Sequence, residues 1–319
     1  MPYLPHSAYR SPFWCRYGHV STIYAGAIRQ TTPPAYQRET WPTSDGDFLL
    51  VDYQLKSGTQ AVILCHGLEG DSRSSYINTA ANYFLANDYS VFSWNNRSCG
   101  GKMNRLPQLY HHASIEDLDD VVQKVLARGF TNVFLIGFSL GGAQVLNYFG
   151  RQEIDARVKA GVAVSTPIDL GASTRKIERG FSKIYLNRFV KKIKAKVQIK
   201  ATEFKGVINA SAVDKARNLD DITECFIVPV HKFDSLDDYY HKVSPAYSMQ
   251  TIKTPVLLLN ALDDPILGKP AFPVEFAKKH AFVHLETPAH GGHCGFPLAK
   301  TEFAYAEIRA LDFFKEWLR

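Results

Sequence analysis

Cysteine and long apolar runs are scarce in this sequence, and each scarcity excludes a class of protein. The five cysteines are an odd number, widely spaced, and none forms a CxxC pair. That pattern favours reduced thiols in a cytoplasmic protein over a disulfide framework or a zinc site. No window reaches the roughly 18 uninterrupted apolar residues of a membrane-spanning helix. The opening stretch MPYLPHSAYRSPFWCRYGH is broken by prolines and polar residues, so no signal peptide is expected.

What is present is the composition of a folded protein with a sizeable core. Of the 319 residues, 45% are hydrophobic and 21% are charged. The net charge of +6 is unevenly spread. Residues 175–205 hold 11 Lys/Arg against two Glu, a local net of +9, which leaves −3 for the rest of the chain. The excess of basic charge therefore belongs to one segment.

Predicted strands and helices alternate along most of the chain. Short apolar runs predict strands at 49–55, 61–65, 90–94, 133–137, 158–165, 255–261 and 282–286. Apolar residues at helical spacing predict helices at 76–88, 114–129, 142–150, 273–280 and 301–318. Ser114 is expected to cap the second of these helices. The alternation predicts an α/β fold with a doubly wound, mostly parallel sheet.

The rhythm stops between residues 166 and 254, which predicts an insertion in a single core domain formed by 1–165 and 255–319. The first half of the insertion carries apolar residues at helical spacing and a lysine-rich opposite face. Either it is a cap helix packed on the core with a solvated basic face, or it makes transient contact with an anionic membrane surface. Nucleic acid is not an expected partner, because the basic stretch lacks interleaved aromatic residues. The predicted stripe contains Ile177, Phe181, Ile184, Leu186, Val190, Ile193 and Val197.

The stretch GFSLGG, residues 137–142, joins a predicted strand to a predicted helix. A phosphate-binding P-loop requires a lysine after the last glycine, and the dinucleotide fingerprint requires G-x-G-x-x-G; neither is present. The pattern fits G-x-S-x-G, in which a serine stands on a strained turn and small neighbours let strand and helix pass closely. The alternative is a tight glycine turn with an incidental serine. We expect Ser139 to be a nucleophile.

A serine nucleophile requires a base, and the base requires an orienting carboxylate. Two polar segments, LDDP and TPAHGGHCGF, follow predicted strands downstream, at the sheet edge where active sites of α/β proteins lie. We expect His293 as the base rather than His290, because two glycines give its loop freedom. We expect Asp263 as the acid rather than Asp264, whose backbone the following proline restricts. A metal site at these residues is not expected, because no ligand-bearing helical spacing is present.

An oxyanion hole should combine the amide after the nucleophile with an amide from the loop HGLEGD, residues 66–71. We expect the amides of Leu140 and Leu68 to be these donors. Gly67 lets the backbone approach the substrate, and His66 is expected to be a structural hydrogen-bonding residue.

Six motifs resemble the YheT-like α/β-hydrolases, which are relatives of the abhydrolase-domain esterases and lipases. They are HGLEGDSRSSY, NNRSCGG, GFSLGG, DDYYHKVSP, LDDP and GGHCGF, in this order, after an opening segment PFWCRYGHVSTIY that is also similar to that family. The resemblance implies an α/β-hydrolase fold with a helical cap, and a triad of Ser139, Asp263 and His293. Glu69 departs from the family pattern, in which a small or uncharged residue is expected. Gly67, Glu69, Phe138 and Tyr239 are expected to border the substrate.

The sequence thus predicts a serine esterase that acts on a small-molecule or lipid-like carboxylic ester and needs no cofactor. Two alternatives remain open. The first is an acyltransferase or phospholipase acting on lipid esters, which differs in the group that accepts or leaves the acyl chain. The second is a non-catalytic lipid or partner binder that keeps the fold, against which a complete triad argues.

Overall fold

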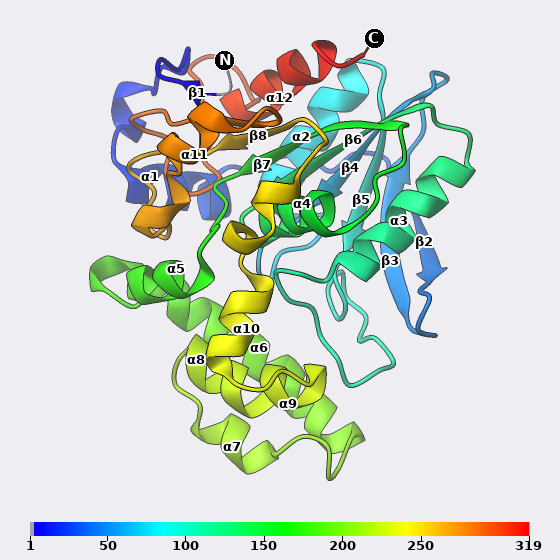
Figure 1. Ribbon diagram of the computed structural model, residues 1–319, viewed down its shortest axis with the longest axis vertical. Coiled ribbons are helices and arrows are strands. Elements are labelled where there is room, and N and C mark those ends of the chain that lie inside the picture. Colours follow the sequence, from blue (N-terminus) through cyan, green and yellow to red (C-terminus); the bar gives the residue numbers. More distant parts are fainter. Residues whose placement is uncertain (1–2, 319) are drawn as a thin grey trace.

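The computed structural model describes residues 3–318, and a nine-stranded sheet runs through its upper part (Figure 1). The outer limits of the predicted core, residues 1 and 319, lie outside the described residues. The strands are β1 (Tyr3–Leu4), β2 (Gln37–Pro42), β3 (Phe48–Gln54), β4 (Gln60–Cys65), β5 (Ser90–Asn95), β6 (Asn132–Phe138), β7 (Val158–Val164), β8 (Val256–Leu259) and β9 (Val283–Glu286).

The strand order across the sheet is β1-β9-β8-β7-β6-β4-β5-β3-β2. The pairs β2–β3 and β3–β5 are antiparallel, and the other neighbouring pairs are parallel. The strand order reverses direction at β4, because β5 lies on one side of it and β6 on the other. Cys65 at the end of β4 pairs with Gly137 near the end of β6. The loops that follow these two strands therefore leave from the same edge of the sheet.

Helices cover both faces of the sheet, which confirms the predicted doubly wound α/β fold. On one face α2 and α12 pack against the strands through residues such as Ile77, Phe84 and Phe314. On the other face α3, α4 and α11 contribute residues such as Leu118, Val145 and Ala277. These helices are α2 (Ser75–Ala86), α3 (Ile115–Ala127), α4 (Leu140–Arg151), α11 (Val274–Lys279) and α12 (Tyr305–Lys315).

Two details of the predicted helices differ in the structure. Helix α12 begins at Tyr305 rather than at Thr301, because Ala304 first forms a bridge with Pro297. Ser114 stands at the N-cap position of α3, but its hydroxyl accepts the amide of His111 instead of a helix amide.

The segment between β7 and β8 is helical and lies together on one side of the sheet, green to yellow in Figure 1. It has a cluster of apolar side chains of its own, which includes Leu186, Val190, Val197 and Phe226. The separation of this segment as a cap stays a prediction. Its helices are α5 (Leu170–Ile177), α6 (Lys183–Glu203), α7 (Ala210–Lys215), α8 (Leu219–Ile222), α9 (Val228–His231) and α10 (Leu236–Val243).

The predicted apolar stripe of the insertion is only partly buried. Leu186, Val190, Ile193 and Val197 line the inner face of α6, and Ile177 is buried in α5. Phe181 and Ile184 instead point outward and are 52% and 55% exposed. Phe181 lies in the short turn before α6, and Ile184 is on the outer side of the first turn of α6, so burial cannot explain their apolar character.

The basic face of α6 is also not uniformly solvated. The Lys200 ammonium is buried and donates to the carbonyl oxygens of Asn104 and Leu106. Lys196 reaches the carboxylate of Glu69 at 2.9 Å. Lysines of α6 thus attach the helix to loops of the core.

Between β1 and β2, a short turn at Phe13–Cys15 leads into α1 (Gly18–Ile23). Figure 1 shows this blue segment on the same side of the molecule as α5 and α11. No helix within residues 3–318 has the length and apolar character required to cross a membrane.

Candidate active site

Ser139 stands at the sharp turn between β6 and α4. Its backbone has φ 54° and ψ −116°, a strained conformation for a residue with a side chain. The glycines around it are required by close contacts. A Cβ on Gly137 would come within 2.2 Å of the Gly141 carbonyl oxygen, and a Cβ on Gly141 within 2.2 Å of the Cys65 carbonyl oxygen. The turn is therefore built so that strand and helix pass almost in contact, with the serine at the apex.

The loop after β9 brings His293 to this serine. The Nε2 atom of His293 lies 2.8 Å from Ser139 Oγ. The His293 backbone amide donates to Thr22 Oγ1 of α1, and the next amide, of Cys294, donates to Ser165 Oγ. His290 lies away from the serine and faces Asp263 instead. The structure thus brings together the two residues that the sequence pairs as nucleophile and base.

The acid beside His293 is Asp264, so the expectation that Asp263 would fill this position is wrong. Asp264 Oδ2 lies 2.8 Å from His293 Nδ1. Its other oxygen accepts the amides of Ile266 and Leu267. The extended backbone before Pro265 does not turn this side chain away. It lets the carboxylate fold over the turn that follows and face the histidine.

Asp263 has a different contact, with the histidine loop itself. Its Oδ1 atom accepts the amide of Gly292, the residue before His293. Its Oδ2 atom lies 3.5 Å from His290 Nδ1. Burial raises the pKa of Asp263 above its ordinary value. Asp263 therefore binds the backbone of the histidine loop, and Asp264 binds its imidazole.

The environment of His293 favours its charged form. Burial lowers its pKa, but the charge and hydrogen bond of Asp264, together with those of the Cys294 thiol, outweigh that effect, and the net pKa is raised well above the ordinary value. The Asp264 carboxylate is fully buried, so water screens its charge little. An imidazole held this way is a strong proton acceptor with one fixed tautomer, protonated on Nδ1 and open on Nε2 toward the serine.

Two backbone amides are free beside the serine. The amides of Leu68 and Leu140 donate to no acceptor within residues 3–318. Leu140 is the first residue of α4, where the helix leaves amides unpaired. Gly67 lies against the nucleophile, since a Cβ there would come within 3.3 Å of the Ser139 Cβ. These are the positions expected for an oxyanion hole.

His66 fixes the peptide that carries the Leu68 amide. Its Nε2 accepts the backbone amide of Asn96, so its proton is on Nδ1 and is donated to the Gly67 carbonyl oxygen at 2.7 Å. Because Gly67 C=O and Leu68 N–H share one planar peptide unit, this bond also sets the direction of the N–H. Complete burial lowers the pKa of His66 to about 4, which keeps it neutral in this role.

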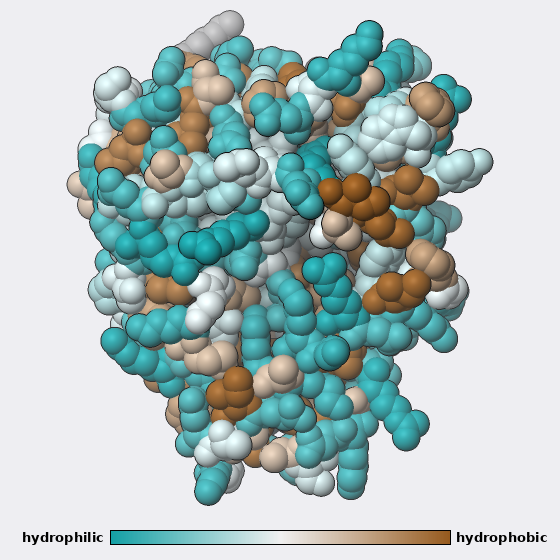
Figure 2. Space-filling view, turned by 180° about the vertical axis from the view of Figure 1, so that it is seen from behind, coloured by the Kyte–Doolittle hydropathy of each residue, from teal (hydrophilic) through white to brown (hydrophobic). Residues whose placement is uncertain are grey.

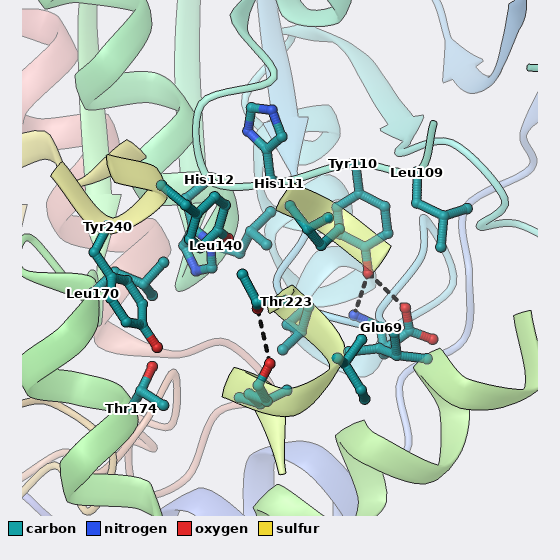
Figure 3. Close-up of a pocket in the computed structure, with 16 residues that line it drawn as sticks. Glu69, Leu109, Tyr110, His111, His112, Leu140, Leu170, Thr174, Thr223 and Tyr240 are labelled. Carbon is teal, nitrogen blue, oxygen red and sulfur yellow. Dashed lines mark hydrogen bonds between the residues drawn. The ribbon is translucent and has the colours of Figure 1, made fainter. Parts of the chain in front are cut away.

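Glu69 does not face solvent. The Tyr110 hydroxyl accepts the Glu69 amide and donates to its carboxylate, both at 2.8 Å (Figure 3). Lys196 of α6 pairs with the same carboxylate. Lys192 donates to the Glu69 carbonyl oxygen. The unusual acid is thus the point at which α6 is joined to the loop that holds Leu68.

A mostly apolar cavity opens beside the free amides, between the sheet edge and the α5–α10 segment (Figure 3). Glu69 and Tyr239, both expected at the substrate, line it. Phe138 does not. Its ring is buried against Tyr76 at a centroid distance of 5.0 Å, because β6 directs this side chain into the core. The apolar lining includes Leu68, Leu109, Leu140, Leu170, Ile193 and Ile227.

Comparison with known proteins decides the family. Residues 60–299 match the family model described as the alpha/beta hydrolase fold. The chain belongs to the α/β-hydrolase family. The match runs from β4 to the loop after His293, so it spans every residue of the site except those of α1.

Among curated proteins, this α/β-hydrolase is similar to phospholipase ABHD3 of Mus musculus. The two are 29% identical over 299 residues, which cover 90% of this chain and 73% of the relative. It is 26% identical over 288 residues to YheT of Escherichia coli, covering 87% and 84% of the two chains. These relatives support the resemblance to the YheT-like group that the sequence motifs suggested.

Among solved structures, the α/β-hydrolase is similar to an esterase from Pyrococcus furiosus, with a TM-score of 0.60 and 16% identity over 91% of this chain and 99% of that one. An esterase from Exiguobacterium antarcticum gives a TM-score of 0.56 and 18% identity, covering 88% and 100%. At these identities the likeness concerns the fold.

Three residues that hold the site of this α/β-hydrolase together were not assigned to it from the sequence. Asp264 was weighed there as the alternative acid, but its chemistry is the same as that of Asp263. Lys196 carried no signal beyond its place in a basic helix. Thr22 carried none, since its partner His293 is 271 positions away.

Proposed function

We propose that this α/β-hydrolase is a serine esterase that cleaves carboxylic esters with an apolar acyl chain. The observation that carries the proposal is the unbroken chain of hydrogen bonds from Ser139 Oγ through His293 to Asp264, with both bonds at 2.8 Å. Nucleophile, base and orienting acid in this order are the requirements for activating a serine. The named esterase and phospholipase relatives favour esters as the substrate class.

In the proposed reaction, Ser139 Oγ attacks the ester carbonyl carbon while its proton passes to His293 Nε2. Asp264 stabilises the imidazolium that forms and keeps the Nδ1 proton in place. The amides of Leu68 and Leu140 donate to the carbonyl oxygen as it becomes negative. The imidazolium then gives its proton to the departing alkoxide, and the acyl group stays on the serine. Water, deprotonated by His293, releases the acid in the second half.

The apolar cavity supports an acyl chain rather than a polar group as the part of the substrate nearest the hole. Leu68 and Leu140, the residues whose amides would form the hole, also line the cavity. An acyl chain that leaves the carbonyl carbon in that direction would be surrounded by apolar side chains, at about 25 cal/mol per Å² buried.

The test is covalent labelling followed by a substrate series. A fluorophosphonate should label the wild type and not Ser139→Ala, and Ser139→Ala should lose hydrolysis of p-nitrophenyl esters by about a million-fold. Equal labelling of both proteins would contradict the proposal. Adding an alcohol acceptor separates hydrolysis from acyl transfer, because a transferase would form a new ester at the expense of free acid.

A separate test addresses whether the cavity holds the acyl chain of the substrate. Leu170→Trp should fill the cavity and shift the preferred acyl length toward shorter chains. The matched control is Ile199→Trp on the exposed side of α6. A shift of the same size in the control would show that the cavity does not hold the acyl chain.

A further inference from the structure

The two most exposed large apolar side chains of the described residues lie close together in the N-terminal segment. Phe13 and Tyr17 are 82% and 76% exposed, and Trp14 and Val20 beside them are also exposed. All four belong to the segment that forms the N-terminal turn and α1. Figure 2 shows brown side chains gathered at the right-hand side of this face, over the N-terminal segment and the start of the helical insertion.

The insertion continues the same surface through Phe181 and Ile184. The ring of His19 in α1 lies 4.9 Å from that of Phe181 and is stacked on Tyr185 of α6 at 5.9 Å. His19 Nδ1 is also hydrogen-bonded to the Tyr185 hydroxyl. The N-terminal segment and the insertion are thus in direct side-chain contact. We call Phe13, Trp14, Tyr17, Val20, Phe181 and Ile184 the apolar patch.

The N-terminal segment that carries part of the apolar patch also contacts the loops of the active site. Thr22 of α1 accepts the amide of His293. Gly18 lies so close to the aspartate loop that a Cβ would come within 1.9 Å of the Asp263 carbonyl oxygen. Whatever covers the patch therefore lies next to the loop that carries His293.

The chemistry of the patch fits a lipid–water interface. Trp and Tyr are the residues enriched at the headgroup level of bilayers, and exposed apolar clusters of this kind mark interaction sites. Four basic side chains border the segments that carry the patch, all of them exposed: Arg10, Arg16, Lys183 and Arg188. None of the four forms an ion pair with a carboxylate of the described residues. Exposed aromatic side chains on segments that also carry cations without carboxylate partners complement an anionic phospholipid surface.

We propose that the apolar patch docks the protein on an anionic phospholipid surface, with the N-terminal aromatics inserted among the headgroups. The inference goes beyond the proposed function, because docking requires neither Ser139 nor an ester. It places the contact on α1 and the start of α6, not on the lysine-rich outer face of the helix as a whole. A lipid ester presented at such a surface would lie beside the histidine loop.

The test is flotation of the full chain with vesicles, in a Ser139→Ala background so that no lipid is hydrolysed. Vesicles of phosphatidylcholine with added phosphatidylglycerol should carry the protein at low salt, and pure phosphatidylcholine should carry less. Phe13→Ser/Tyr17→Ser should lower the apparent affinity at least about tenfold. The matched control is Leu55→Ser/Tyr247→Ser, two exposed apolar residues elsewhere, 48% and 56% exposed. Its binding should stay at the wild-type level, and thermal unfolding checks that both variants fold.

Trp14 supplies a second measurement that folding defects do not mimic. Lipids brominated near the headgroup should quench the protein's fluorescence, and Trp14→Phe should abolish most of that quenching. Absence of vesicle binding at low salt, or equal loss in the control variant, would overturn the proposal. So would a dimer in solution that Phe13→Ser/Tyr17→Ser converts to a monomer without any vesicle binding, since the patch would then bind a second copy. Because Ser139→Ala is used, these outcomes are independent of whether the protein hydrolyses esters.

Discussion

At the scale of single residues, the adjacent aspartates after β8 differ in what they hold. Asp264 is buried and gives one oxygen to His293 and the other to two amides of its own turn. Asp263 holds the amide of Gly292. The same functional group thus acts on the imidazole in one case and on the loop backbone in the other. Their substitutions should have different effects.

Asp264→Asn should lower kcat/KM by about ten-thousand-fold, because an amide in that place can donate to Nδ1 and stabilise the wrong tautomer. Asp263→Asn keeps an oxygen for the Gly292 amide and should lower kcat/KM less than about tenfold. The measurement is steady-state hydrolysis of a soluble short-chain ester, with fluorophosphonate labelling rates alongside. The assignment fails if Asp263→Asn is the more damaging of the two.

The pH dependence of activity should depend on the contact between Asp264 and His293. Asp264, together with the Cys294 thiol, outweighs burial and raises the pKa of His293, and only the neutral imidazole can accept the serine proton. Activity should therefore fall as the pH drops through a midpoint above about 6.5, the ordinary histidine value. In Asp264→Asn the midpoint of the residual activity should move to lower pH. A midpoint unchanged by the substitution would show that another group controls the acidic limb.

The sequence predicts those site residues that are marked by their immediate neighbours in the chain, and not those that are set by contacts between distant segments. The serine is marked by glycines that adjoin it in the chain, and the histidine by its place after a strand. The acid could not be chosen from the sequence, because Asp263 and Asp264 have the same chemistry and the choice depends on amides of a turn. Phe138 was misplaced because adjacency to Ser139 in the chain does not give the direction of a strand side chain.

At the scale of secondary-structure elements, α6 is attached to the core by charged contacts as well as by its apolar face. Lys196 and Glu69 join it to the loop of the free Leu68 amide, with side chains 19% and 3% exposed. Lys200 is buried on loop carbonyl oxygens. The helix therefore cannot be lifted from the core without exposing or separating these charges.

Lys196→Met should lower the free energy of unfolding by about 3 kcal/mol, because it leaves the Glu69 carboxylate buried without its cation. Lys191→Met, on the exposed side of the same helix, should change it by less than about 0.5 kcal/mol. Urea unfolding of both variants provides the comparison. Adding Glu69→Gln to Lys196→Met should restore part of the loss, since no charge is then left unpaired. Equal stability of the two lysine variants would contradict the buried pair.

The strands and helices of the core were predictable, and most helices of the insertion were not, for one physical reason. A core strand is an apolar run bounded by turns, and a helix that covers the sheet repeats its apolar residues every three or four positions. Helices α7, α8 and α9 have only six, four and four residues. Segments that short are stabilised by tertiary packing rather than by a local pattern. The same holds for α1, whose place is set by contacts with the histidine loop.

At the scale of the whole molecule, several histidines are folded in a neutral state. Burial lowers the pKa of His66, His231 and His284 to about 4, that of His112 to about 3, and that of His111 well below its ordinary value. The pKa of His293 is shifted in the opposite direction. Below about pH 6.5 the unfolded chain binds protons on these five histidines, which the folded protein keeps neutral. Proton binding therefore favours the unfolded state as the solution becomes acidic, and five groups outweigh one.

The melting temperature should accordingly fall between about pH 7 and about pH 5, with each of these histidines costing on the order of 1–2 kcal/mol at the lower pH. His284 allows the cause to be isolated. It lies in β9, packs against Phe313 at 5.1 Å, and its Nε2 has no partner in the described residues. His284→Phe keeps an aromatic ring there and removes one titrating group. The variant should lose less stability on acidification than the wild type, as calorimetry at the two pH values would measure. If both proteins lose the same amount, the acid sensitivity arises from carboxylates, and the neutral histidines do not limit the stability of the fold.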